Sequence, residues 1–134
     1  MKTLKVIICK AGKGVSADLP EVEGFVIARK TVEELKRELR AGLKFHIEGL
    51  YEEEKQAWMN EEYNFEYIYN DIPAFIEAHS GIINQSTLAR ISGINESLMR
   101  QYTSGIKKAT PRTLSRVKKG LNEYSDMLRK VEFA

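Results

Sequence analysis

The polar side chains best placed for chemistry lie between residues 85 and 108. The run Gln85–Gly105 (QSTLARISGINESLMRQYTSG) predicts two short helices, 85–92 and 96–103, with Gly93 at the turn between them. Gly93 and Gly105 can take the left-handed backbone conformation that ends a helix. Amide, hydroxyl and basic groups at such a place hydrogen-bond to phosphates and base edges of DNA. The candidate residues are Gln85, Ser86, Asn95, Glu96, Ser97, Arg100, Gln101, Ser104, Lys107 and Lys108.

Helical spacing predicts which side chains of this run are buried. The residues expected where the two helices meet are Leu88, Ala89, Ile94, Met99 and Tyr102. With Asn95 as the cap, the second helix then exposes Glu96, Ser97, Arg100 and Gln101. A helical hairpin with no nucleic-acid ligand would bury the same apolar residues. The polar outer surface therefore favours DNA binding over a purely structural hairpin.

Charge is distributed unevenly along the chain. The net charge is +2 overall, but residues 1–70 carry −2 and residues 71–134 carry +4. Between Arg90 and Lys119 there are eight basic residues and one acidic residue, Glu96. A charge run is usually a solvated surface, yet such a concentration in a small segment is typical of a polyanion-binding protein.

Other chemistries find little support in the sequence. There is no phosphate-binding glycine loop, no metal-ligand cluster and no nucleophile–histidine pattern, so we expect no cofactor and no metal. Cys9, the single cysteine, is expected to be a small buried hydrophobe, and His46 a packed boundary residue. The apolar run 6–9 is too short for a signal peptide, and no run reaches the ~20 residues that span a bilayer. We expect a cytoplasmic protein.

The first half of the chain predicts a small sheet with one helix. The predicted strands are 4–9, 15–19, 25–28 and 64–70, with a tight turn at 11–14 and a helix over 31–50. Residues 52–62 are expected to form a loose connector. The three aromatic residues of the last strand, Phe65, Tyr67 and Tyr69, are interpreted as core or interface rather than as a base-stacking platform.

The predicted helix over 31–50 should cover one face of the sheet formed by the first three strands. Thr31 and Glu34 have the spacing of a capping box at its start. Its apolar stripe is Val32, Leu35, Leu39, Leu43, His46/Ile47 and Leu50. Its expected outward residues are Glu33, Lys36, Arg37 and Arg40.

The second half is predicted to be wholly helical. Asp71 can cap a first helix that stops near residue 80, and Thr110–Pro111 starts the last one. The apolar stripe of the last helix is Leu114, Val117, Leu121, Tyr124, Leu128 and Val131. The first part of this stripe should pack on the domain core. The part from Tyr124 onward either folds back or forms the seam of a homodimer, which would present two recognition helices to DNA.

The run 85–105 resembles the lambda-repressor-like (Xre-type) helix-turn-helix family without a gap. Glutamine begins the run, Ala-Arg lies in the first helix, and glycines stand at the turn and the end. The segment 107–114 (KKATPRTL) resembles the family's basic loop and the proline-started helix that follows it. The resemblance places Gln85 and Ser104 near phosphates and Arg100 at the edge of the major groove. It points Glu96, Ser97 and Gln101 towards that groove, with Glu96 a departure in charge.

Residues 3–50 resemble the HicB family of antitoxins, with a looser likeness over 51–70. The matching segments are 15–20 (VSADLP), 31–35 (TVEEL) and 41–50 (AGLKFHIEGL). The stretch 21–26 (EVEGFV) departs from the family by being longer than its usual corner. The resemblance implies a partial ribonuclease-H-like domain that binds a small basic HicA-type toxin, an RNA-cleaving protein, over its catalytic histidine. Family members that join this domain to a helix-turn-helix repress their own operon.

These observations predict an α+β protein in two parts. Residues 1–70 form a β-β-β-α-β, partial ribonuclease-H-like toxin-binding domain, and residues 71–134 form an all-α helix-turn-helix domain whose last helix is available for dimerisation. The expected function is an antitoxin that also represses its operon by binding operator DNA. The alternative is a transcriptional regulator without a toxin, whose first domain senses a ligand or oligomerises. A residual nuclease is disfavoured because the strand 4–9 carries no acid, although Asp18, Glu34, Glu66 and Asp71 are available carboxylates.

Overall fold

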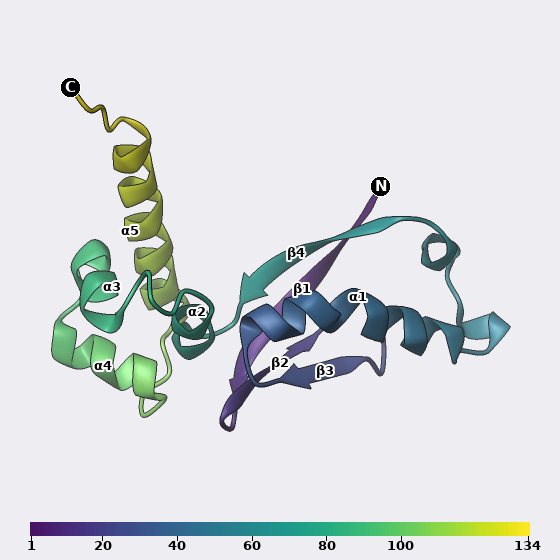
Figure 1. Cartoon of the computed structure of the whole chain (residues 1–134). Coiled ribbons are helices and arrows are strands. Elements are labelled where there is room, and N and C mark those ends of the chain that lie inside the picture. The colour runs from purple at the N-terminus through teal and green to yellow at the C-terminus, as the bar shows by residue number, and fades with distance from the viewer. The chain divides into compact units, whose positions relative to one another are not determined.

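The computed structural model describes all 134 residues as two compact units, Met1–Asn70 and Asp71–Ala134. The chain has the mixed α+β composition expected, with one four-stranded sheet in the first unit and five α-helices in all (Figure 1). The boundary between the units falls where the hydrophobic pattern changes from alternating to helical. None of the helices combines the length and the apolar character needed to cross a membrane.

The sheet of the first unit has the strand order β3-β2-β1-β4. Its strands are β1 (Lys2–Ala11), β2 (Gly14–Asp18), β3 (Val26–Arg29) and β4 (Tyr63–Tyr69). The first three strands are antiparallel neighbours, and Gly12 takes a φ of 56° in the tight turn between β1 and β2. β4 lies parallel to β1 on the other side. All four predicted strands are thus present, each within two residues of its expected position.

Helix α1 (Val32–Glu48) covers the face of the sheet that carries Leu4, Val6 and Ile8. The Thr31 hydroxyl caps it by accepting a hydrogen bond from the Glu34 N–H at 3.1 Å. Five residues of the predicted apolar stripe are buried, namely Val32, Leu35, Leu39, Leu43 and Ile47. His46 lies half-buried at the edge of this stripe, with its ring 5.3 Å from that of Phe25, as expected for a packed boundary residue.

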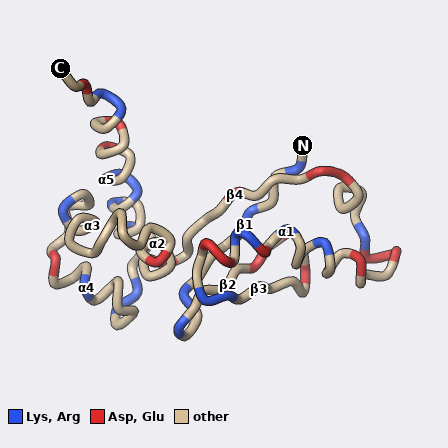
Figure 2. Tube along the Cα trace, in the orientation of Figure 1, with Lys and Arg blue, Asp and Glu red and all other residues tan.

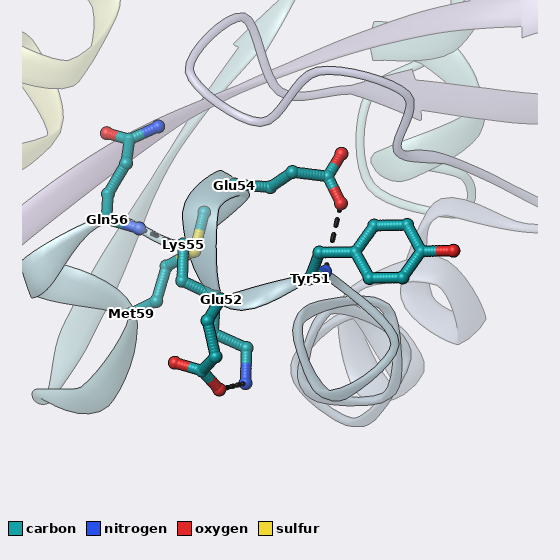
Figure 3. A network of polar contacts seen from close by, with 6 residues as sticks. All are labelled: Tyr51, Glu52, Glu54, Lys55, Gln56 and Met59. Carbon is teal, nitrogen blue, oxygen red and sulfur yellow. Dashed lines mark hydrogen bonds and ion pairs between the residues drawn. The ribbon is translucent and has the colours of Figure 1, made fainter.

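Residues 52–62 connect α1 to β4 as expected, but the expectation that this connector is loose is wrong. The chain forms two short 3₁₀ turns here, Glu52–Glu54 and Ala57–Asn60. In Figure 3, the Tyr51 N–H donates to Glu54 Oε1 at 2.9 Å and the Gln56 N–H donates to Met59 Sδ at 3.4 Å. Burial of Met59 anchors the second turn, and neither these local contacts nor that burial has a periodic signature in the sequence.

Cys9 and the aromatic row of β4 are less deeply buried than the strand core. Cys9, expected to be buried, is half-buried, because its side chain points to the sheet face opposite α1. Phe65, Tyr67 and Tyr69 lie beside Leu4, Val6 and Ile8 in the parallel register and share their face.

The second unit is wholly helical. Its helices are α2 (Ile72–Ala78), α3 (Gln85–Ser92), α4 (Glu96–Ser104) and α5 (Pro111–Arg129). The side chains of Asp71, Asn84, Asn95 and Thr110 cap the four helices in turn. The buried core is Ile72, Leu88, Ala89, Ile94, Met99, Tyr102 and Val117. It includes all five residues predicted to be buried between α3 and α4.

Candidate nucleic-acid interface

The turn between α3 and α4 is set by Gly93. This residue takes φ 65° and ψ 31°, a left-handed conformation that strains a residue with a Cβ. Next along the chain, the Ile94 N–H donates to the Ala89 carbonyl at 3.0 Å. The Ile94 side chain then enters the core, so the direction of α4 follows from the end of α3.

Helix α5 holds the carboxyl end of α3 in place. The Arg116 guanidinium donates a hydrogen bond to the Gly93 carbonyl oxygen. At Gly120 the two backbones approach so closely that a Cβ would overlap the Ile91 carbonyl oxygen. Sequence reasoning missed both contacts, because they depend on how two helices cross rather than on the spacing within either one.

Helix α4 has a buried face and an exposed polar face. Met99 and Tyr102 are buried in the core of the second unit. The predicted outer residues Glu96, Ser97, Arg100 and Gln101 are all exposed. The burial of the inner face therefore fixes the direction in which the outer face projects.

Two hydrogen bonds connect this exposed face to the first turn of α3. Ser86 Oγ donates to Glu96 Oε1 at 2.6 Å, and Thr103 Oγ1 donates to Gln85 Oε1 at 2.8 Å. Both bonds use acceptor oxygens, so the amide N–H groups of Gln85 keep their capacity to donate. The first turn of α3 and the outer face of α4 thus form one continuous polar surface.

Asn95 has a structural task at the start of α4. Its Oδ1 accepts hydrogen bonds from the Ser97 N–H at 2.8 Å and the Leu98 N–H at 3.3 Å. These bonds satisfy two of the amides that a helix start leaves without partners. Asn84 caps α3 in the same way by accepting from Thr87 at 2.9 Å. Asn84 was not among the predicted candidates, although the spacing Asn-x-x-Thr is a signal for such a cap.

The segment after α4 carries exposed cations. Gly105 ends the helix with φ 82°, and the Lys107 N–H donates back to the Gln101 carbonyl at 3.1 Å. This bond fixes the backbone of the loop that presents Lys107 and Lys108. Both lysines are exposed, and no carboxylate pairs with either of them or with Arg100. Figure 2 shows basic residues along α3, α4, the loop after it and α5.

The carboxylates considered for a nuclease do not form a cluster. No group of three or more His, Cys, Asp or Glu side chains has an arrangement that could hold a metal ion. Asp71 accepts from the Ala74 N–H at 2.8 Å and serves as the cap of α2. Thr31 and Glu34 form the cap of α1 through the Glu34 backbone.

The aromatic row of β4 is covered by two cationic side chains of α1. Lys36 Nζ lies 4.5 Å from the ring centroid of Tyr67 and 3.2 Å from the Tyr69 hydroxyl. The Arg40 guanidinium lies 4.8 Å from the Phe65 centroid. Lys36 and Arg40 are exposed, as predicted, but their contacts with the aromatic rings of β4 were not predicted.

Lys36 and Arg40 contact the aromatic row because of the position of β4 in the sheet. It extends the sheet beyond β1, so that residues on the flank of α1 also lie over strands. Burial raises the pKa of the Tyr67 hydroxyl, with the nearby Arg40 charge acting in the opposite direction.

Comparison of the chain with protein-family models, with characterised proteins and with solved structures finds no match. The function must therefore be inferred from the residues and geometry of the chain itself.

Proposed function

We propose that the second unit is a helix-turn-helix domain of the lambda-repressor-like (Xre-type) class that binds double-stranded operator DNA. The observation that carries the proposal is the exposed outer face of α4, with Arg100 and Gln101 held outward by the burial of Met99 and Tyr102. A helix of this diameter fits the major groove, where amide and guanidinium groups distinguish bases. In this arrangement α3 is the positioning helix and α4 is the recognition helix.

Phosphate contacts come from the two ends of this surface. Gln85 and Ser86 lie in the first turn of α3, where backbone N–H groups and the helix dipole attract an anion. Ser104, Lys107 and Lys108 follow the carboxyl end of α4. Contacts at both ends would hold the duplex in register, while Ser97, Arg100 and Gln101 read bases between them.

The contact between Ser86 and Glu96 accounts for the single acid on this surface. A bare carboxylate among phosphates would oppose DNA binding. Because Ser86 donates to it at 2.6 Å, Glu96 is held in one orientation and keeps a second oxygen that can accept from a cytosine amine.

For the first unit we propose a HicB-type, partial ribonuclease-H-like domain that binds a small basic HicA-type toxin. The strand order β3-β2-β1-β4, with β4 parallel to β1 and a helix between β3 and β4, supports this interpretation. The sheet face opposite α1 carries Ile7, Cys9 and Ile68, and Val26 is 66% exposed. Apolar side chains on such a face suit a protein partner better than a small ligand. The whole chain would then be a cytoplasmic antitoxin and autorepressor.

DNA binding is tested by titrating the protein into two labelled duplexes of equal length. One carries the DNA upstream of the protein's own reading frame, and the other carries the same bases in scrambled order. We expect tighter binding to the first duplex at every salt concentration, by about 10³-fold or more. Equal affinity for the two would leave only general polyanion binding and refute the operator proposal.

Toxin binding is tested with the small basic protein encoded beside this one, where there is such a neighbour. Calorimetry should give a tight complex, and co-expression should restore growth that the neighbour alone arrests. Val26→Asp should weaken that complex without changing operator affinity. Lys13→Asp, in the hairpin turn of the same unit, should change neither the affinity for the neighbour nor the affinity for the operator. Tight operator binding without any protection from the neighbour would favour a transcriptional regulator that has no toxin partner.

A further inference from the structure

Two adjoining hollows lie between α3 and α5 within the second unit. The first, of about 320 Å³, is at the carboxyl end of α3, and the second, of about 560 Å³, is beside its amino end. Arg90 and Ile91 line both, so the two hollows form one groove along the contact of the two helices. Hollows of this size are typical of sites for small molecules. None of the residues proposed to contact DNA lines either of them.

The first hollow is basic. Its charged side chains are three cations, Arg90, Arg116 and Lys119, and one carboxylate, Glu123. All four are exposed, and none of them takes part in an ion pair. Because the cations outnumber the acid, an anion bound here would relieve the repulsion among them.

Ser92 gives a second, independent indication of a polar ligand. It is the last residue of α3, lines the first hollow and is only 8% exposed. Its hydroxyl has no hydrogen-bond partner within the chain. A buried hydroxyl without a partner costs free energy and is rare in folded proteins. A phosphate or carboxylate oxygen can accept from this hydroxyl, and from the N–H groups of Arg116 that the Gly93 carbonyl does not occupy.

The second hollow is apolar. No acidic or basic side chain lines it except Arg90, at its junction with the first. Two of its apolar residues are well exposed, Ile82 at 83% and Leu128 at 54%. An apolar group bound between them would remove this surface from water, which is favourable. The apolar walls are formed by Ile82, Ile83 and Ile91 on one side and by Leu121, Tyr124 and Leu128 of α5 on the other.

We propose that the groove between α3 and α5 binds a small amphiphilic anion, a free molecule with a phosphate or carboxylate head and an unbranched apolar tail. The head lies in the first hollow, beside Arg116, Lys119 and Ser92. The tail lies in the second hollow, and Arg90 contacts the head at the junction. The order of the two hollows fixes the orientation of the ligand, and its binding needs no DNA.

Arg116 connects this site to α4. It donates to the carbonyl of Gly93, and Gly93 sets the turn from which α4 begins. A guanidinium binds a phosphate more strongly than it binds a neutral carbonyl, so the head of the ligand competes with Gly93 for Arg116. The consequence for DNA rests on the proposed function: a bound ligand loosens the turn that directs α4 and weakens operator binding.

The first test is calorimetry of the full-length protein with decyl phosphate below its critical micelle concentration. Inorganic phosphate supplies the head alone, decanol supplies the tail alone, and decyltrimethylammonium carries the same tail with a positive head. We expect decyl phosphate to bind about 10-fold or more tightly than each of these, because it alone suits both hollows. An affinity no higher than that of inorganic phosphate or of decyltrimethylammonium would overturn the proposal, as would a groove that another chain already covers.

Two pairs of matched variants locate the site. Lys119→Glu reverses a charge in the first hollow, and Lys118→Glu makes the same change on an exposed residue of α5 outside it. Leu128→Ser removes apolar surface from the second hollow, and Met127→Ser does so outside it. The two variants in the hollows should weaken decyl phosphate binding about 10-fold, and the two controls by less than about 2-fold. Circular dichroism should show unchanged helix in all four, since these side chains are exposed. Equal losses in variants and controls would contradict the proposed site.

A free ligand is distinguished from a membrane lipid with vesicles that contain phosphatidylglycerol. This lipid has the same kind of head and tail, but they are held within a bilayer. We expect Lys119→Glu and Lys118→Glu to sediment with the vesicles to the same extent. Vesicle binding that Lys119→Glu alone abolishes would overturn the assignment to a free molecule.

Operator titrations measure the consequence for DNA. Saturating decyl phosphate should weaken operator binding by wild type about 5-fold or more, and the operator should weaken decyl phosphate binding by the same factor. Lys118→Glu should keep this response, and Lys119→Glu should lose it at the same ligand concentration. A ligand that binds without changing operator affinity would refute the link through Arg116. A protein that binds decyl phosphate but no operator would refute the proposed function alone.

Discussion

Glu96 is the residue whose role depends most on a contact with another helix. Its position on the outer face of α4 was predicted from helical spacing, and it is exposed there. Its hydrogen bond from Ser86 could not be predicted, because it depends on the angle at which α3 and α4 cross. The same holds for the bond between Gln85 and Thr103. Sequence reasoning thus found the candidate residues but not how they support one another.

Glu96→Gln removes the single negative charge between Arg90 and Lys119. We expect affinity for an unrelated duplex to rise roughly 3- to 5-fold, because a carboxylate near phosphates is repelled. Affinity for the operator should rise less or fall, since the orienting contact with Ser86 is weakened. Fluorescence anisotropy on both duplexes measures the ratio of operator affinity to affinity for the unrelated duplex, and Glu123→Gln on α5 is the control. An increase of this ratio in Glu96→Gln would contradict the proposed position of Glu96.

Lys107→Ala should weaken binding to all duplexes by a similar factor. A lysine that contacts a phosphate releases about one counterion on binding, so the slope of log K against log salt should become shallower by about 1. Lys13→Ala, in the hairpin turn of the first unit, keeps the same change in net charge and should leave the slope unaltered. A loss of affinity confined to the operator duplex would instead mean that Lys107 contacts bases.

Tyr67 predicts a dependence of stability on alkaline pH. Its pKa is raised above 10.0 because burial disfavours the phenolate, while the nearby Arg40 charge acts in the opposite direction. The folded state therefore holds the proton more tightly than the unfolded state does. The resulting stability is fully present below pH 10 and is lost as the pH rises through the folded-state pKa. Thermal unfolding between about pH 9 and 11 should show a smaller decline for Tyr67→Phe than for wild type. Identical declines would show that Tyr67 does not contribute.

At the scale of elements, the carboxyl end of α3 is fixed by α5. Gly120 allows this packing, because any Cβ there would overlap the Ile91 carbonyl oxygen. The sequence offered only an isolated glycine within a helical pattern. Its meaning became apparent from the crossing of α3 and α5.

Gly120→Ala should therefore destabilise the second unit by about 1–3 kcal/mol, as overpacking does. Helix propensity alone would predict the opposite sign, a gain of up to about 1 kcal/mol. Denaturant unfolding followed by circular dichroism measures the difference. Ser115→Ala, on the exposed side of the same helix, should stay within about 0.5 kcal/mol of wild type. A stabilised Gly120→Ala protein would show that the two helices can separate at no cost.

Most elements were predicted because each has a periodic signature. The strands of the first unit alternate, α1 has a stripe at steps of three and four, and Thr31 and Thr110 give recognisable caps. The two 3₁₀ turns between Glu52 and Asn60 have no such signature and were missed. The place of β4 beside β1 was not specified either. That placement is why the exposed side chains of Lys36 and Arg40 also contact aromatic rings.

At the scale of the whole molecule, the two units differ in charge and in the partner proposed for each. Residues 1–70 carry −2 and residues 71–134 carry +4. A basic toxin is suited to the first unit and a polyanion to the second. Opposite charges in one chain keep the two proposed partners from competing for a single surface.

The central claim is that the outer face of α4 reads base sequence, and selection of duplexes from a random pool tests it most directly. Wild type should select a consensus with base preferences in each half-site. Gln101→Ala should lose the preference at one position in each half-site and weaken operator binding by about 1–3 kcal/mol. Lys107→Ala should select the wild-type consensus at lower affinity. An unchanged consensus for Gln101→Ala, Arg100→Ala and Ser97→Ala together would contradict the claim.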